Sequence, residues 1–215
     1  MRVNRFAAVA FVGLLPAASA LAVDVGNVDE FATAGDLENW GGGSLIYTNP
    51  GTGGVGGAGD GYLRVENDIF AAQLGARALD AAYNGDWLAA GATGLSFWLR
   101  DESLTNPIEI HVGIGQAFGN FWLNTQGFTL TSEWQQFSVD FSNPGEWTQI
   151  IGGGTFEDAL TVVDRVLFRH DVAPFNQQPN FIQAGFGIDR VTILPTPGVA
   201  GVLGLASLAA LRRRR

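Results

Sequence analysis

The sequence predicts an all-β protein, a sandwich of two sheets with one short helix. Several segments alternate apolar and polar residues with a period of two, as strands buried on one face do. The 215 residues include 30 glycines, which place turns between short segments. Only one segment has the spacing of a helix. Many short antiparallel strands separated by turns are typical of a jelly-roll β-sandwich.

Six segments carry the strand pattern. Their inward positions are mostly aromatic or β-branched, which predicts that they supply the core. In chain order they are residues 62–66, 95–100, 108–114, 134–141, 165–169 and 186–193.

Turn-forming clusters rich in glycine, asparagine or proline separate these segments. The longest, residues 49–61, is too rich in glycine to build a core and is predicted to be a flexible surface loop. Residues 155–163 are the one predicted helix, with Thr155 as its cap and Glu157 and Asp158 in its first turn. The other clusters are residues 84–86, 142–145 and 152–154.

The chain divides into three parts: residues 1–22, a body of residues 23–194, and residues 195–215. Residues 1–22 predict a signal peptide, because Arg2 and Arg5 precede an apolar run that ends in small residues. A buried N-terminal helix is the alternative. Cleavage would leave a mature chain that begins near Leu21 or Val23.

The last 21 residues combine a proline turn, an apolar run and a basic end. Pro195 and Pro197 precede residues 199–211, which as a helix span about 20 Å, less than the ~30 Å core of a bilayer. Positive residues after such a run stay in the cytoplasm. These residues are Arg212, Arg213, Arg214 and Arg215.

These three parts, in this order, resemble the PEP-CTERM sorting signal of bacterial exosortases. Thr196 stands where that signal has glutamate. The resemblance implies export, transient attachment to the membrane by the C-terminal helix, and cleavage by an exosortase-like membrane protease at the cell surface. A plain tail anchor is the alternative.

The body has the composition of one soluble, acidic domain. It holds all 21 acidic residues and six arginines, so its formal charge is −15, against −9 for the whole chain. Such a surface repels phosphate backbones and argues against nucleic-acid binding. The absence of cysteine excludes thiolate metal sites and cysteine nucleophiles.

Three segments of the body resemble galactose-binding-like jelly rolls of the carbohydrate-binding-module type. Residues 31–40 look like their first-strand region, residues 134–141 like their W-x-x-[FY]-x-V strand, and residues 187–193 like their last strand. The segments occur in the family's order. The resemblance implies a jelly roll whose role is to bind sugars.

The same resemblance implies a structural Ca²⁺ ion. In that family an aspartate of the last strand and an acidic residue near the first bind calcium. The matching residues are Asp189 with Asp29 and Glu30, and carboxylate and carbonyl oxygens are the ligands that Ca²⁺ prefers. A pair between Asp189 and Arg190, or exposure to solvent, is the alternative.

Tryptophans near turns are candidates for stacking on sugars, with packing beneath a loop as the alternative. Trp98 and Trp134 lie in predicted strands and are expected in the core. The candidates for ligand binding are Trp40, Trp87, Trp122 and Trp147.

The sequence therefore favours an exported, non-catalytic protein of the cell surface or matrix that binds glycans. A purely structural component of an extracellular matrix is nearly as well supported, because fold alone does not carry function. A small secreted polysaccharide hydrolase or lyase is the second alternative, since two carboxylates from distant strands would suffice.

Overall fold

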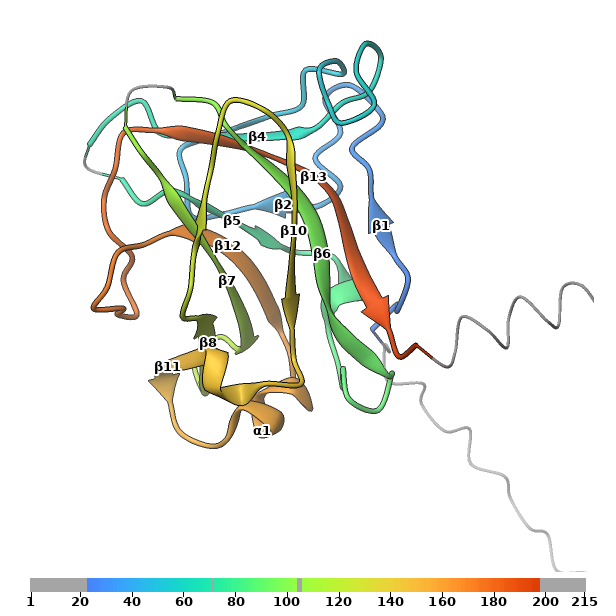
Figure 1. Ribbon diagram of the computed structural model, residues 1–215, viewed down its shortest axis with the longest axis vertical. Helices are drawn as coiled ribbons and strands as arrows, with labels where there is room; N and C mark the ends of the chain where they lie inside the picture. Colours follow the sequence, from blue (N-terminus) through green and yellow to red (C-terminus); the bar gives the residue numbers. More distant parts are fainter. Residues whose placement is uncertain (1–22, 71, 104–105, 198–215) are drawn as a thin grey trace, which may run out of the picture.

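The computed structural model describes residues 23–70, 72–103 and 106–197, and these residues form a β-sandwich of two antiparallel sheets (Figure 1). This confirms the predicted fold class. The predicted signal peptide and most of the predicted C-terminal tail lie outside the described residues. Pro195, predicted to begin the tail, is the last residue of a strand.

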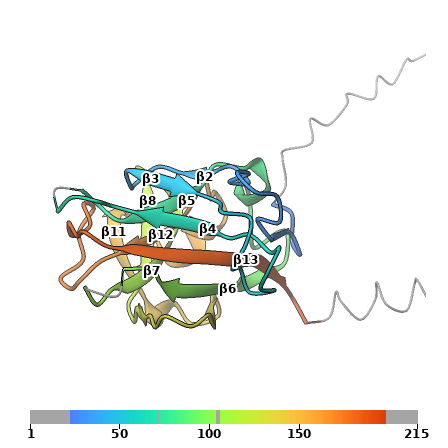
Figure 2. The same cartoon turned by 90° about the horizontal axis from the view of Figure 1, so that it is seen from above.

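The first sheet, sheet A, has the order β10-β6-β13-β4-β3, and β1 also pairs with β13. Figure 2 shows β3, β4, β13 and β6 side by side in this order. The strands are β1 (Val28–Asp29), β3 (Ile46–Thr48), β4 (Leu63–Glu66), β6 (Ala92–Asp101), β10 (Gln135–Asp140) and β13 (Gly185–Pro195).

The second sheet, sheet B, has the order β11-β8-β7-β12-β5-β2, and β9 also pairs with β7. Its strands are β2 (Trp40–Gly41), β5 (Gly75–Ala78), β7 (Glu109–Gln116), β8 (Asn120–Asn124), β9 (Phe128–Thr129), β11 (Trp147–Gly152) and β12 (Arg165–His170).

Apolar residues of alternating positions fill the space between the sheets. Phe97 of β6 and Phe168 of β12 meet there edge to face, with ring centroids 4.7 Å apart. Both are fully buried, and burial of such a side chain contributes roughly 1.5–3 kcal/mol. The six predicted strands correspond to β4, β6, β7, β10, β12 and β13, so the period-two alternation correctly predicted these strands of the two sheets.

Within the described residues, three short helices lie in the connections between strands. The α-helix α1 (Phe156–Leu160) begins at Thr155, whose side chain accepts a hydrogen bond from the Asp158 amide. This confirms the predicted cap, but the helix ends earlier than residue 163. The other two are 3₁₀ turns, η1 (Ala81–Tyr83) and η2 (Pro144–Glu146).

The glycine-rich segment 49–61 lies on the outer face of sheet A and is tied to that sheet. The Gly53 carbonyl accepts hydrogen bonds from Arg100 Nη1 at 3.0 Å and from Trp134 Nε1 at 2.9 Å. Within the segment, the Gly54 amide donates to the Asp60 carbonyl at 2.8 Å. The loop was predicted from its glycine content, and these hydrogen bonds hold it in a defined conformation on the sheet.

Candidate functional site

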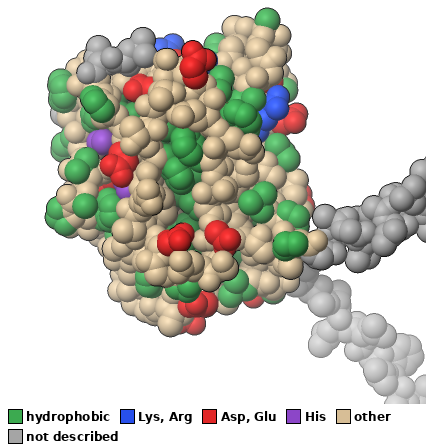
Figure 3. All heavy atoms as spheres, viewed as in Figure 1, with side chains coloured by type: hydrophobic (Ala, Val, Ile, Leu, Met, Phe, Trp, Pro, Cys, Tyr) green, Lys and Arg blue, Asp and Glu red, His purple; other side chains and the backbone are tan. Residues whose placement is uncertain are grey.

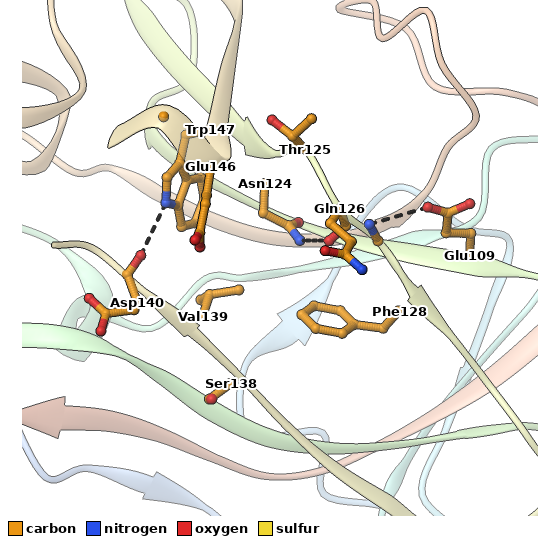
Figure 4. A pocket seen from close by; sticks show the side chains of 12 residues that line it. Glu109, Asn124, Thr125, Gln126, Phe128, Ser138, Val139, Asp140, Glu146 and Trp147 are labelled. Atoms are coloured by element: carbon orange, nitrogen blue, oxygen red, sulfur yellow. Dashed lines mark hydrogen bonds between the residues drawn. The ribbon is translucent and has the colours of Figure 1, made fainter. Parts of the chain in front are cut away.

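A groove of about 760 Å³ opens between the edge of sheet A and the neighbouring end of sheet B. Figure 4 shows its walls: β10 lies along one side, and the residues that connect β8 to β9 lie along the other. Its lining residues are Glu109, Asn124, Thr125, Gln126, Gly127, Phe128, Ser138, Val139, Asp140, Gly145, Glu146 and Trp147.

The groove exists because the chain changes sheets there. β10 pairs with β6 in sheet A, and after η2 the chain continues as β11 in sheet B. Trp147 holds this crossing: it stacks on Phe156 with centroids 4.7 Å apart, and its Nε1 donates to the Asp140 carbonyl at 3.1 Å. The free edge of β10 therefore stays open as one wall.

The opposite wall is set by the buried side chain of Asn124. Its Oδ1 accepts the Val112 amide at 2.5 Å and its Nδ2 donates to the Gln126 carbonyl, which fixes the turn after β8. The Gly127 amide donates to Glu109 Oε1 at 3.2 Å. A Cβ at Gly127 would lie 2.6 Å from His111 Nε2 and against the Glu109 side chain, so a larger residue would have to displace both side chains.

Polar side chains project into the groove around one aromatic ring. Thr125, Gln126 and Ser138 are exposed, and they offer hydroxyl and amide groups to a ligand. Phe128 is half-buried and packs on Phe137 with centroids 4.8 Å apart, so its ring is held in place. The wall thus combines hydrogen-bonding groups with a rigid apolar surface.

Carboxylates dominate the charge of the groove. Glu109, Asp140 and Glu146 line it, and none of its twelve lining residues is basic. The backbone amide of Ser142 donates to Asp140 and lowers the pKa of that carboxyl. Asp140 is therefore ionised at neutral pH and is unsuited to act as the proton donor of a glycoside hydrolase.

Figure 3 shows the surface of the molecule from the side of Figure 1, with acidic and hydrophobic side chains spread over this face and basic ones near its upper edge. Because the groove itself is lined by three carboxylates and no basic residue, a neutral, hydroxyl-rich ligand suits it better than an anion does.

Sequence reasoning missed most of the groove. It predicted Trp147 alone among the lining residues, as a ligand-binding tryptophan. The signal that could have found the groove is the cluster 142–145, which was predicted as a turn but not as a change of sheet.

Three of the four tryptophans predicted to bind a ligand are core residues. Trp40, Trp87 and Trp147 are 2 %, 0 % and 5 % exposed, so no sugar can stack on their faces and this prediction was wrong for them. Trp147 contributes to the floor of the groove only. Trp122 is half-buried against Phe156, with centroids 5.7 Å apart.

The two tryptophans expected in the core lie elsewhere. Trp98 and Trp134 are half-buried. Trp98 alternates with the core residues Phe97 and Leu99 and therefore points outward from sheet A. Trp134 lies edge to face against Tyr62. The Arg100 guanidinium lies over both rings, 4.4 Å from the Tyr62 centroid and 4.7 Å from the Trp134 centroid. The period-two alternation predicted the strands correctly, but it did not predict whether each tryptophan points into the core or away from it.

The structure does not bring Asp29 and Asp189 together. Asp29 points into the core, where its Oδ2 accepts hydrogen bonds from Trp40 Nε1 and Tyr83 OH, both at 2.6 Å. Burial raises the pKa of Asp29 despite these bonds. A bulge in β13 at Arg190, which has a φ of 50°, puts Asp189 on the opposite face.

Glu30 follows Asp29 and is exposed. The described part of the chain holds no group of three or more histidine, cysteine, aspartate or glutamate side chains arranged for a metal ion. Calcium binding stays a prediction.

Asp189 lies under the glycine-rich loop and has no exposed surface. Its Oδ2 accepts the Val55 amide at 2.8 Å, and its Oδ1 is buried without a hydrogen-bond partner. Burial raises the pKa of this carboxyl to about 6. Gly54 has no room for a side chain, since a Cβ there would lie 2.9 Å from Asp189 Oδ2 and would meet the Gly61 carbonyl.

Among the residues 23–197 that are described, no helix is long and apolar enough to cross a membrane. The apolar run 199–211 and the four terminal arginines lie outside them.

No family model and no curated protein matches the sequence. Solved structures do match in fold. An exo-β-agarase has a TM-score of 0.58 at 13 % identity over 81 % of this chain, and the chain spans only 25 % of that protein.

Two further matches are carbohydrate-binding modules. A family 11 module from Clostridium thermocellum has a TM-score of 0.50 at 15 % identity, covering 80 % of this chain and 97 % of the module. The tandem CBM22 domains of Paenibacillus barcinonensis Xyn10C have a TM-score of 0.50 at 11 % identity, covering 83 % of this chain and 48 % of theirs. At these identities the likeness shows that the chain shares the jelly-roll sandwich of carbohydrate-binding modules.

Proposed function

We propose that this protein is a non-catalytic saccharide-binding β-sandwich whose ligand lies in the groove between β10 and the β8–β9 connection. The groove itself carries the proposal: about 760 Å³ of space lined by exposed hydroxyl, amide and carboxylate groups around the ring of Phe128. Ligand pockets in proteins are commonly ~300–1,000 Å³, so the groove has room for a short oligosaccharide.

The charge of the groove defines the class of sugar. Carboxylates accept hydrogen bonds from hydroxyl groups, and charge-assisted bonds of this kind are the strong ones. They repel uronate and sulfate groups. A neutral saccharide is therefore the proposed ligand.

The structural likeness supports the proposal without carrying it. The family 11 module from Clostridium thermocellum was solved in complex with a β-1,3-1,4-mixed-linked tetrasaccharide. A mixed-linked β-glucan is for this reason the first ligand to test.

The test measures binding of the purified protein to neutral glycans by glycan array and titration calorimetry. Gln126→Ala and Glu146→Gln should each weaken binding by about tenfold, the effect of losing a hydrogen bond of about 1.4 kcal/mol. The matched controls are Gln178→Ala and Glu133→Gln, which make the same changes at exposed positions away from the groove. Equal effects in controls and groove variants would refute the proposed site.

Absence of binding to every glycan would leave the purely structural role. Release of reducing ends from a bound glycan would instead support the hydrolase alternative.

We further propose that the protein is exported and sorted by an exosortase-like membrane protease. The support is the sequence of the two ends, residues 1–22 and 195–215. N-terminal sequencing and intact mass of the protein from its native cells test this. The expected mature form begins near residue 21 or 23 and lacks the four terminal arginines, and intact ends in a cytosolic protein would refute it.

A further inference from the structure

Two of the six arginines in the body form no ion pair in the described part of the chain. The other four form ion pairs with carboxylates: Arg64 with Glu66 and Glu102, Arg100 with Glu102, Arg169 with Asp171, and Arg190 with Asp60. Arg77 and Arg165 take part in no ion pair within the described part of the chain. In a body with 21 acidic residues this is unexpected.

Arg77 and Arg165 are neighbours on the outer face of sheet B. Arg77 alternates with the buried Ala76 and Ala78 on β5, and Arg165 precedes the buried Val166 on β12. Leu167 pairs directly with Arg77, so Arg165 lies diagonally across, where Cα atoms are about 7–8 Å apart. Burial, and then the positive charge of Arg77, lower the pKa of Arg165. The neighbouring Asp164 acts in the opposite direction but ranks after both causes. Two like charges thus lie close together, and neither forms an ion pair.

Arg169, on the same strand and the same face, shows how this fold neutralises an arginine. It pairs with Asp171, and the carbonyls of Asn176 and Gln177 accept hydrogen bonds from its guanidinium. The segment after β12 thus folds over Arg169. It provides no such partner for Arg77 or Arg165.

The two arginines are half-buried, and an exposed aromatic ring lies beside one of them. The Arg77 guanidinium lies against Gly42, where a Cβ would be 2.8 Å from its Nε, and this Nε is buried without an acceptor. Arg165 lies 5.3 Å from the centroid of the Phe118 ring, and Phe118 is 80 % exposed. A guanidinium pair matches the two oxygens of a carboxylate or sulfate, and an exposed ring matches the apolar face of a sugar.

We propose that Arg77 and Arg165 form a second binding site, which takes the carboxylate or sulfate group of an acidic saccharide, with Phe118 beside it. The choice of a saccharide as the carrier of the anion rests on the proposed function. The site differs from the groove in charge, since the groove has three carboxylates and no basic residue. Its ligand is therefore a different sugar, or an acidic unit of a heteropolysaccharide.

The test measures the affinity of the purified protein for alginate, a polyuronate, and for dextran sulfate, with neutral dextran as the reference. A body with a charge of −15 repels polyanions, so binding requires a local basic site. We expect binding at low salt that weakens as salt rises. Arg77→Gln and Arg165→Gln should each reduce it by about tenfold or more.

Arg64→Gln is the matched control, because it removes the same charge from sheet A, where Arg64 is paired with Glu66. Unfolding midpoints of all variants establish that they fold. Equal weakening by Arg64→Gln, or no binding of the wild type to either polyanion, would overturn the proposal. A wild-type dimer that Arg165→Gln dissociates, without polyanion binding, would also overturn it and assign the site to a second copy of the chain.

The Gln126→Ala variant separates this inference from the proposed function. We expect it to bind alginate as the wild type does. Binding of neutral glycans that Gln126→Ala weakens, without binding of polyanions, would refute the arginine site alone. Binding of polyanions without neutral glycans would refute the groove alone.

Discussion

Replacing Asp189 with asparagine should remove a pH-dependent loss of stability. Asp189 is fully buried beneath the glycine-rich loop, and one of its oxygens has no hydrogen-bond partner. Burial is the largest cause that raises its pKa from 3.8 to about 6, and the hydrogen bond from Val55 acts in the opposite direction. Asparagine keeps the shape and an acceptor for Val55, and it carries no charge.

The sign of the effect follows from the direction of the pKa shift. The folded protein holds the Asp189 proton more tightly than the unfolded chain does, so protonation stabilises the fold. This contribution is complete below the unfolded pKa of 3.8 and is lost as the pH rises through about 6. A shift of roughly two units corresponds to about 3 kcal/mol in the free energy of unfolding.

Urea unfolding of the wild type and Asp189→Asn, followed by tryptophan fluorescence in EDTA across this pH range, measures the difference. We expect the variant to gain up to about 3 kcal/mol relative to the wild type as the pH rises from about 4 to above 7. The raised pKa of Glu38, about 7, adds its own slope to both proteins and cancels in the comparison. Asp68→Asn, at an exposed carboxylate, controls for the loss of one negative charge. Parallel profiles for the wild type and Asp189→Asn would refute the reasoning.

Three further predictions concern the same loop, calcium and the helix. If Asp189 takes part in a calcium site, calorimetry should give a higher melting temperature with Ca²⁺ than with EDTA, and an unmoved midpoint would end that expectation. Gly54→Ala should destabilise the fold by roughly 1–3 kcal/mol because its Cβ meets the Gly61 carbonyl; Gly153→Ala, with nothing within 4 Å, is the control, and equal urea midpoints would contradict this. Thr155→Ala should cost about 1 kcal/mol in urea unfolding by removing the cap of α1, and an unchanged midpoint would show that the capping box is dispensable.

The sequence was sufficient to predict the strands that are buried on one face. In β7, the apolar Ile110, Val112 and Ile114 alternate with His111 and two glycines, and this pattern was visible in the residues alone, although the outer-face residues are covered as well. β8 was missed because its apolar residues Phe121, Trp122 and Leu123 are consecutive, so no alternation marks it. β1, β2 and β9 have two residues each, too few for a periodic signal.

The position of a side chain relative to the two sheets was harder to predict than the strands. The tryptophans at the glycine-rich turns point inward, and buried acceptors bind their indole N–H groups. Asp29, for example, accepts the hydrogen bond of Trp40 Nε1. The bulge at Arg190 reverses the face of Asp189 relative to Val191, and no pattern in the sequence announces an extra residue in a strand. The groove depends on where the chain crosses between sheets, which is a property of long-range pairing.

The central strand of sheet A is the last strand among the described residues. β13 pairs with β6, β4 and β1, whose residues lie up to 164 positions earlier. Until residue 185 and those after it have emerged from the ribosome, the β10–β6 pair, the β4–β3 pair and β1 therefore have no strand that joins them. Closure of this sheet must wait until residues 185–195 have been synthesised, because β6 and β4 have no common neighbour before then.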